Sequence, residues 1–190
     1  MEMPIKSIRF EKGWLQKYVD TTDTVMDFGC GLMALTRHLQ CKKIYGFDVW
    51  QSYIDQLKDE IKDERFVFKQ MDIPKEIHTL DDNCIDVSLG IDIVEHFEKI
   101  EALYVIKHME RIARKRIIIF TLLGFLKQED GAGWGKDNPE YQKHRCGFTH
   151  SEFHDLGYET IQRKGGDNIA ILAIKNGDKC AASKCCNPSI

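Results

Sequence analysis

Residues 25–31 read VMDFGCG, a short apolar run that ends in two glycines, and this stretch decides the fold class. An apolar run of this kind is typical of a buried strand. Glycines directly after a strand let the backbone turn tightly and approach a ligand without an intervening Cβ. A helix after the turn would add free N–H groups that favour a bound carboxylate or phosphate. The stretch therefore predicts a ligand-binding turn between a strand and a helix.

Short apolar runs alternate with amphipathic segments along the rest of the chain. Ile54, Leu57 and Ile61 have helical spacing, and residues 116–122 (RIIIFTL) form the continuous apolar run of a strand buried on both faces. Alternating strands and helices predict a parallel, doubly wound sheet. Further strands are expected at residues 43–47, 65–69, 83–89, 158–163 and 168–174, and helices at 32–39, 51–62, 100–112 and 151–156.

The last two expected strands are joined by a short connection that contains Gly165 and Gly166. A connection this short suits a hairpin, so one strand of the pair should run antiparallel to the rest. The expected fold is α/β, with a doubly wound, mostly parallel, seven-stranded Rossmann-like sheet and an antiparallel last strand.

The composition fits one globular domain, because 43% of the 190 residues are hydrophobic and 30% are charged. We predict a single domain over residues 1–176, in which residues 1–23 form a short helix near the ligand cleft. Residues 177–190, which contain Cys180, Cys185 and Cys186, are expected to be a disordered tail.

The chain carries no sign of membrane or nucleic-acid binding. No apolar run approaches the roughly 20 residues that span a bilayer, and the first residues lack a signal peptide's apolar core. A net charge of -3 and a pI near 6.2 leave no basic excess. We therefore expect a cytoplasmic protein with a small-molecule substrate, no nucleic-acid partner and no membrane partner. The sequence does not predict an oligomeric state.

Asp48 ends the second expected strand, 21 positions after Asp27. An acidic residue at about this distance from a glycine turn can accept both ribose hydroxyls of a nucleotide. A nicotinamide-dependent oxidoreductase shares this geometry, and residues 29–34 (GCGLMA) keep it open as an alternative. Asp27, however, would repel a pyrophosphate at the turn, and its charge suits a cation such as a sulfonium or an ammonium.

Residues 25–31 resemble the first motif of class I S-adenosylmethionine-dependent methyltransferases, with Met33 where the family often has a third glycine. Residues 85–89 (IDVSL) resemble the family's fourth-strand motif, and residues 92–96 (DIVEH) resemble the segment after it. Together with Asp48 and Asp72, these matches follow the family's order along the chain. The chain is therefore identified by resemblance as a small methyltransferase of a type with no assigned substrate.

The resemblance implies S-adenosylmethionine as the cofactor and gives several residues an expected role. Asp27 and the glycine turn would hold its amino-acid end, Asp48 the ribose and Asp72 the adenine. Gly90 and Ile91 would line the floor near the methyl group. The predicted cofactor-binding residues are Asp27, Gly29, Cys30, Gly31, Asp48, Val49, Asp72, Ile73, Gly90 and Ile91.

Residues 137–148 (DNPEYQKHRCGF) resemble a loop that lies near the cleft in small methyltransferases of unassigned substrate. Long loops often carry function, and a plain surface loop is the alternative interpretation. The loop contains His144, which is therefore a candidate for a residue that faces the substrate.

Asp92, Glu95 and His96 would share one face if their segment is helical. His96 is then a candidate general base for an acceptor hydroxyl. The small-RNA 2′-O-methyltransferases have a similar segment and a later histidine, here His144, and this resemblance implies a divalent ion. An ordinary family sequence without catalytic role is the third interpretation. We predict His96 and His144 as catalytic residues and assign no metal.

Three functions stay open at this point. The first is a methyltransferase acting on a small molecule or, alternatively, a metal-assisted enzyme acting on RNA 2′-hydroxyls. The second is an NAD-dependent oxidoreductase, which Asp27 disfavours. The third is a binding module that keeps the fold without catalysis.

Overall fold

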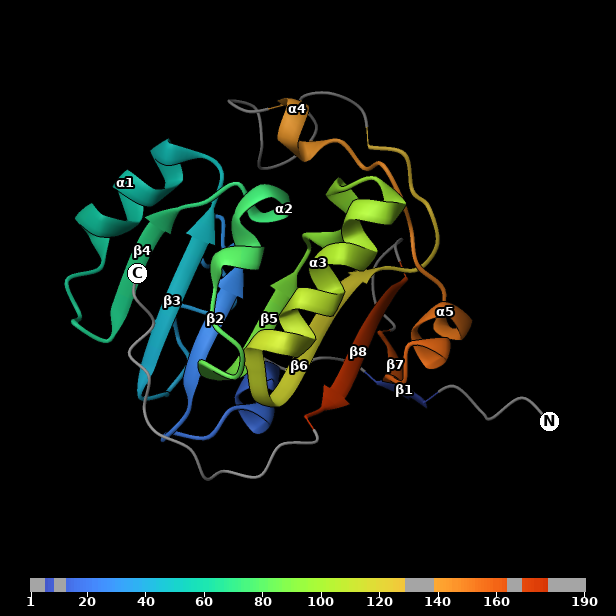
Figure 1. Cartoon of the computed structure of the whole chain (residues 1–190), viewed down its shortest axis with the longest axis horizontal. Coiled ribbons are helices and arrows are strands. Elements are labelled where there is room, and N and C mark those ends of the chain that lie inside the picture. Colours follow the sequence, from blue (N-terminus) through green and yellow to red (C-terminus); the bar gives the residue numbers. More distant parts are fainter. Residues whose placement is uncertain (1–5, 9–12, 129–138, 164–168, 178–190) are drawn as a thin grey trace.

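The computed structural model describes residues 6–8, 13–128, 139–163 and 169–177. Their eight strands form one sheet in the order β1-β7-β8-β6-β5-β2-β3-β4, with helices packed on it (Figure 1). The strands are β1 Lys6–Ile8, β2 Thr24–Phe28, β3 Lys43–Asp48, β4 Phe66–Gln70, β5 Ile85–Ile91, β6 Ala113–Leu122, β7 Glu159–Arg163 and β8 Ala170–Asn176. The α-helices are α1 Gln51–Glu60, α2 Ile73–Glu76, α3 Lys99–Ile112, α4 Pro139–Gln142 and α5 His150–Asp155, and the 3-10 helices are η1 Trp14–Tyr18, η2 Ile77–Thr79 and η3 Val94–His96.

The predicted doubly wound sheet is confirmed. Strands β4, β3, β2, β5 and β6 are parallel neighbours, and β8 runs antiparallel to both β6 and β7. All seven predicted strands are present. The short strand β1 adds an eighth at the edge, parallel to β7. Because the chain order reverses between β2 and β5, a crevice is expected beyond the carboxyl ends of these two strands.

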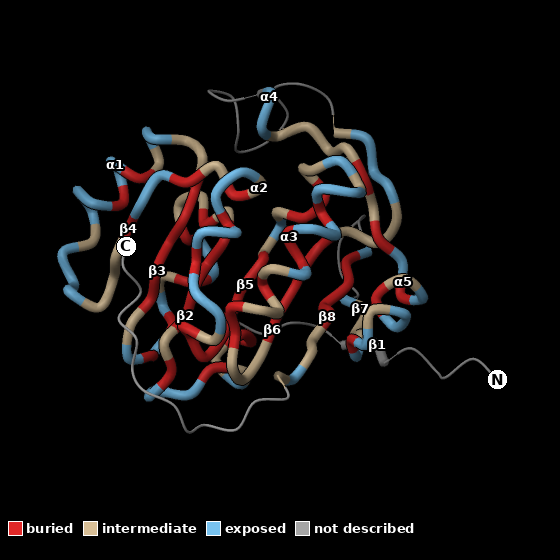
Figure 2. Tube along the Cα trace, in the orientation of Figure 1, coloured by how far each residue is buried: buried red, intermediate tan, exposed pale blue. Residues whose placement is uncertain are grey.

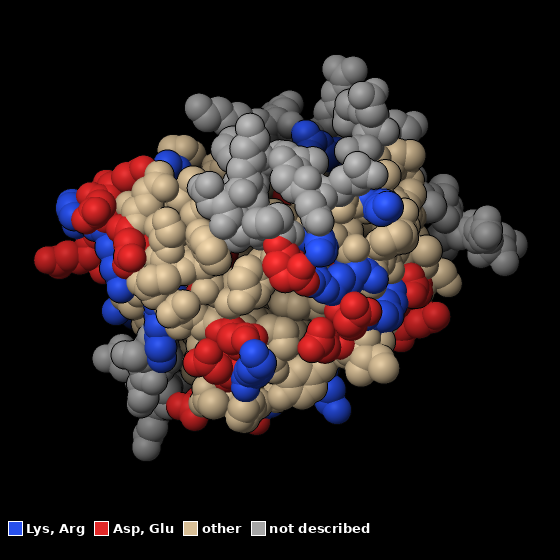
Figure 3. Space-filling model, turned by 90° about the horizontal axis from the view of Figure 1, so that it is seen from above, with Lys and Arg blue, Asp and Glu red and all other residues tan. Residues whose placement is uncertain are grey.

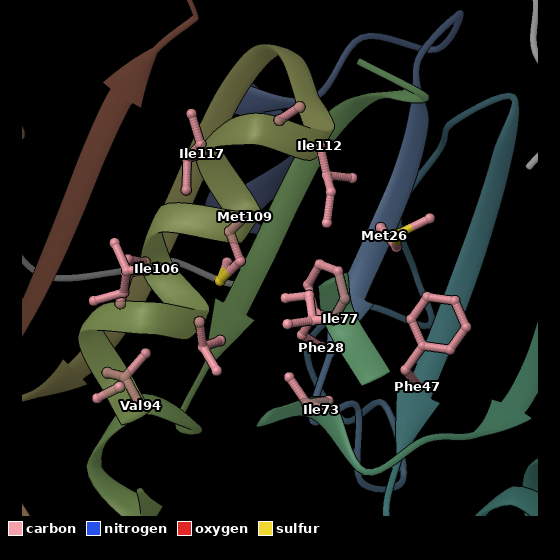
Figure 4. Close-up of a cluster of buried hydrophobic side chains, with 14 of the residues drawn as sticks. Met26, Phe28, Phe47, Ile73, Ile77, Val94, Ile106, Met109, Ile112 and Ile117 are labelled. Atoms are coloured by element: carbon pink, nitrogen blue, oxygen red, sulfur yellow. The ribbon is translucent and has the colours of Figure 1, made fainter. Parts of the chain in front are cut away.

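The sheet is covered on both faces, and this explains its buried strands. Ile106 and Met109 of α3 belong to the same buried apolar cluster as Met26 and Phe47 on one face (Figure 4). On the other face, Leu57 of α1 belongs to a second apolar cluster that is built on the alternate strand positions. The central strands are therefore buried along almost their whole length, while the helices keep an exposed outer side (Figure 2).

Two local predictions were wrong. Residues 32–39 form consecutive turns and no assigned helix, and Met33 has a positive φ of 55°, which interrupts helical backbone there. Ser151, whose hydroxyl could cap the helix expected at residues 151–156, lies inside α5. The cap is Thr149, whose hydroxyl accepts from the Glu152 N–H while the Glu152 side chain accepts from the Thr149 N–H.

The N-terminal segment also departs from the prediction of one short helix near the cleft. Its described part contains strand β1 and the 3-10 helix η1, and Trp14 and Leu15 are buried in the cluster that contains Leu57. Apolar burial of these two side chains therefore holds η1 against the sheet.

Residues 178–190 lie outside the described residues, and with them the prediction for the cysteine-containing tail. Cys30, Cys41, Cys84 and Cys146 are buried free thiols. Within the described ranges, no helix combines the length and the apolar character needed to cross a membrane. The cytoplasmic location stays a prediction.

Candidate cofactor and substrate site

A cavity of about 700 Å³ lies at the carboxyl ends of β2, β3 and β5, where the crevice is expected. Its turn side contains Asp27, the glycine turn at residues 29–31 and Asp48. Its histidine side contains Asp92, Glu95, His96 and His144. No described residue between 13 and 23 lines it. One continuous cavity therefore joins the two sets of residues that the sequence singled out.

The glycine turn depends on two left-handed residues. Gly29 has a φ of 68°, and a Cβ there would lie 2.4 Å from Cδ1 and 2.9 Å from Cβ of Ile93. Gly31 has a φ of 49°, but an added Cβ would meet nothing within 4 Å. Gly29 is therefore required for both conformation and space, and Gly31 for conformation alone.

The carboxylate of Asp48 braces this turn. One oxygen accepts a hydrogen bond from the Gly31 N–H at 2.9 Å, and the other accepts from the Trp50 N–H at 2.9 Å. Burial raises the pKa of Asp48, and the backbone donors oppose that change. The side chain is thus held at the cavity wall in one orientation, as a ribose-binding acid must be.

Asp27 is almost fully buried under the turn. The Thr36 hydroxyl donates to its Oδ2 at 2.6 Å, whereas Oδ1 has no hydrogen-bond partner among the described residues. Burial, opposed by the Thr36 hydrogen bond and reinforced by the charge of Asp48, raises the pKa of Asp27 to about 7. A buried carboxylate oxygen without a donor fits a cationic ligand group and would repel a phosphate.

Nine of the ten predicted cofactor-binding residues line the cavity. Asp72 forms an ion pair with Lys75 at 2.6 Å and immediately precedes α2. Ile73, the first residue of α2, lies in the cavity wall. Gly90 is the exception, because it is buried and an added Cβ would meet Met109 at 3.1 Å and Ile93 at 3.3 Å. Gly90 is therefore not among the lining residues, and its contact with the cofactor stays a prediction. The nine are Asp27, Gly29, Cys30, Gly31, Asp48, Val49, Asp72, Ile73 and Ile91.

On the histidine side, backbone hydrogen bonds join the segment that contains Glu95 and His96 to the segment that contains His144. The carbonyl of Glu95 accepts from the N–H groups of Arg145 at 2.8 Å and Cys146 at 3.2 Å. The Arg145 guanidinium also donates to the His96 carbonyl at 3.2 Å. These contacts bring the two predicted catalytic histidines together, with the ring centroids of His96 and His144 5.1 Å apart.

Charge and burial perturb the groups on this side. Burial, reinforced by the nearby Asp92 carboxylate, raises the pKa of Glu95 to about 8. Burial also lowers the pKa of His96 to about 4, and repulsion from His144 and Arg145 contributes. Two acids and two imidazoles thus share one end of the cavity, and a perturbed set of this kind is typical of functional sites.

Some residues of the site were missed by sequence reasoning. Thr36 carries no motif, and only the fold reveals its hydrogen bond to Asp27. The rings of Trp50 and Tyr141 lie 6.2 Å apart and connect the segment after Asp48 with α4. An aromatic residue next to a ribose acid is a weak signal that could have drawn attention to Trp50.

The fold is a doubly wound α/β sheet, and the cavity beyond its strand ends brings a buried carboxylate together with a glycine turn. The methyltransferase domain family matches residues 26–120, which are half of the chain. The chain therefore belongs to this family, and the predicted class of S-adenosylmethionine-dependent methyltransferases, with that cofactor, is confirmed.

Solved structures support the fold at low sequence identity. A magnesium protoporphyrin IX methyltransferase from Synechocystis PCC 6803, solved with bound S-adenosylhomocysteine, is 16% identical with a TM-score of 0.63, covering 87% of this chain and 79% of its own. A putative S-adenosylmethionine-dependent methyltransferase from Listeria monocytogenes is 13% identical with a TM-score of 0.64, covering 88% and 99%. A methyltransferase from Methanosarcina mazei is 12% identical with a TM-score of 0.64, covering 90% and 99%. None of the curated proteins compared with the chain matches it.

Proposed function

We propose that the protein transfers the methyl group of S-adenosylmethionine to a small-molecule acceptor held on the histidine side of the cavity. One observation carries this proposal: the cavity that contains Asp27 and Asp48 continues to His96 and His144. Its volume of about 700 Å³ lies within the usual range of small-molecule sites. The bound cofactor supplies an activated methyl group for in-line displacement by the acceptor.

The protein's own contribution is mainly to hold the two reactants. Asp27 attracts the ammonium end, Asp48 holds the ribose, and the Gly29 turn lets the backbone approach. Alignment of two bound reactants can lower a barrier by about 7–11 kcal/mol. His96 contacts the acceptor end in its neutral form, but a base with a pKa of about 4 accepts a proton weakly at neutral pH.

RNA 2′-hydroxyl methylation is a second candidate, favoured by the grouping of two carboxylates with His96 and His144. The charge distribution argues against it. On the face viewed in Figure 3, several basic side chains of the described residues form one short group that acidic side chains flank, and this group does not extend across the face. A protein that binds RNA through its phosphates needs a continuous basic track.

Transfer of an isotope-labelled methyl group tests the proposal directly. The protein is incubated with methyl-labelled S-adenosylmethionine and either a nucleic-acid-free metabolite pool or total RNA, and the products are identified by mass spectrometry. We expect label in a metabolite, and none with Asp48→Ala, whose folding is checked by its melting temperature. Label in RNA alone would contradict the small-molecule acceptor, and no label in either pool would contradict transfer to the acceptors tested.

A further inference from the structure

We propose that Glu95, His96 and His144 bind one divalent first-row transition-metal ion on the histidine side of the cavity. Each of the three offers one ligand atom, and these atoms all lie within 4.8 Å of one another. Ligand atoms bonded at about 2.1 Å to a single ion can lie at most about 4.2 Å apart. A small side-chain rotation therefore suffices to bring the three onto one ion.

The buried oxygen of Glu95 is an independent observation that points to a cation. The side chain is 3% exposed, and its Oε2 has no hydrogen-bond partner among the described residues. A buried carboxylate oxygen without a donor is costly, and Asp92 adds a second negative group nearby. A bound cation would satisfy the oxygen and relieve the repulsion between the two acids.

Both imidazoles have the backbone hydrogen bond that metal-ligating histidines usually have. Nδ1 of His96 lies 3.2 Å from the carbonyl oxygen of Lys143, and Nδ1 of His144 lies 2.6 Å from that of Leu126. A carbonyl oxygen can only accept a hydrogen bond, so each Nδ1 carries the proton. Each Nε2 then has a free lone pair, and a backbone carbonyl behind the ring fixes this tautomer.

The donor set indicates the kind of ion. Two imidazole nitrogens and one carboxylate suit Zn²⁺, Co²⁺ or Fe²⁺, whereas Mg²⁺ prefers an all-oxygen environment. Three protein ligands leave at least one coordination position open, as in catalytic metal sites. The three residues line the cavity, so acceptor oxygens would be the natural further ligands. This last step rests on the proposed methyltransferase function, while binding of the ion does not.

The fold explains why the ligands meet only in the folded chain. Glu95 and His96 belong to η3, directly after β5, and His144 follows α4. The Glu95 carbonyl holds the Arg145 and Cys146 N–H groups, and this pairing sets the position of His144. An unfolded chain lacks this pairing, so binding of the ion should also stabilise the native state.

Titration of the metal-free full-length protein with Co²⁺ tests the site. We expect one Co²⁺ per chain with a visible absorption band, displaced by Zn²⁺. Glu95→Gln and His144→Ala should each weaken Co²⁺ binding by about a hundredfold or more, since loss of a mere supporting contact already costs about 10–100-fold. His154→Ala, which removes an exposed histidine that bonds to Thr160, should change nothing.

Two controls separate binding at this site from ligation by the cysteine thiolates and from misfolding of a variant. A parallel protein with Cys180, Cys185 and Cys186 replaced by serine reports any thiolate ligation and should keep the band. S-adenosylhomocysteine affinity, measured on every variant, should stay within a few-fold of the wild type and thereby shows that the fold persists.

The outcomes distinguish the two proposals. No Co²⁺ binding, or binding that survives both ligand variants or disappears with the cysteines, would overturn the metal site and leave the methyltransferase proposal intact. Failure to bind S-adenosylhomocysteine, with Co²⁺ binding as expected, would count against the proposed function alone.

Discussion

Asp27 and Asp48 stand at or near the ends of adjacent strands, and Asp27 pairs in register with Gly46 of β3, two residues before Asp48. His96 and His144, by contrast, come from separate segments joined by hydrogen bonds to the Glu95 carbonyl. The residues of the turn side therefore belong to the strands or follow them directly, whereas the residues of the histidine side come from separate segments that hydrogen bonds bring together. A cofactor that the members of a family share suits the turn side, which the sheet positions. An acceptor that differs between members suits the histidine side, because connecting segments vary more in sequence.

Substitutions in the glycine turn should have the largest effect on stability and cofactor affinity, because the turn side is positioned by the sheet. Gly29→Ala adds left-handed strain of about 1–2 kcal/mol and an overlap with Ile93 that costs about 1–3 kcal/mol. Gly31→Ala adds the strain alone, since its Cβ would meet nothing within 4 Å. Denaturant unfolding and S-adenosylhomocysteine calorimetry should show the first variant strongly impaired and the second mildly. Equal effects would contradict the close packing of Gly29 against Ile93.

The pH dependence of cofactor binding is the next largest effect. Burial raises the pKa of Asp27 to about 7, with Asp48 contributing, and only the ionised carboxylate attracts an ammonium group. S-adenosylhomocysteine should therefore bind about tenfold more tightly at pH 8 than at pH 6. The free protein should lose stability over the same range, because the folded state holds a proton that the unfolded state has released. Asp27→Asn should remove the pH dependence of binding and should reduce the loss of stability, to which the raised pKa of Glu95 also contributes. A pH-independent affinity of the wild type would contradict the assignment.

Loss of the aromatic contact between the turn side and the histidine side should have the smallest effect on cofactor affinity. The Trp50 and Tyr141 rings lie 6.2 Å apart, and such a pair contributes about 0.5–1.5 kcal/mol. Tyr141→Ala should weaken S-adenosylhomocysteine binding by about threefold to tenfold in calorimetry. Tyr104→Ala, which removes an exposed ring on α3 against His108, is the matched control and should have no effect. Identical affinities for both variants would show that the sides act independently.

The sequence brings the residues of the turn side to one cavity wall because its signals are local. A strand, two glycines and an acid at the next strand end specify Asp27, Gly29 and Asp48 without reference to distant residues. The histidine side was predicted only as a set of candidates, since no local pattern encodes the pairing of Glu95 with Arg145 and Cys146.

The errors have the same origin. The turns at residues 32–39 replace a helix that the apolar spacing favoured. The burial of Trp14 and Leu15 depends on the far face of the sheet, which residues 1–23 do not reveal.

A carboxylate beneath the glycine turn should select a nucleoside that carries an ammonium group over one that carries a diphosphate. Calorimetric titration of the wild-type protein with S-adenosylhomocysteine and, separately, with NADH tests it most directly. We expect binding of one S-adenosylhomocysteine per chain and no measurable heat with NADH. Binding of NADH that excludes S-adenosylhomocysteine would contradict it.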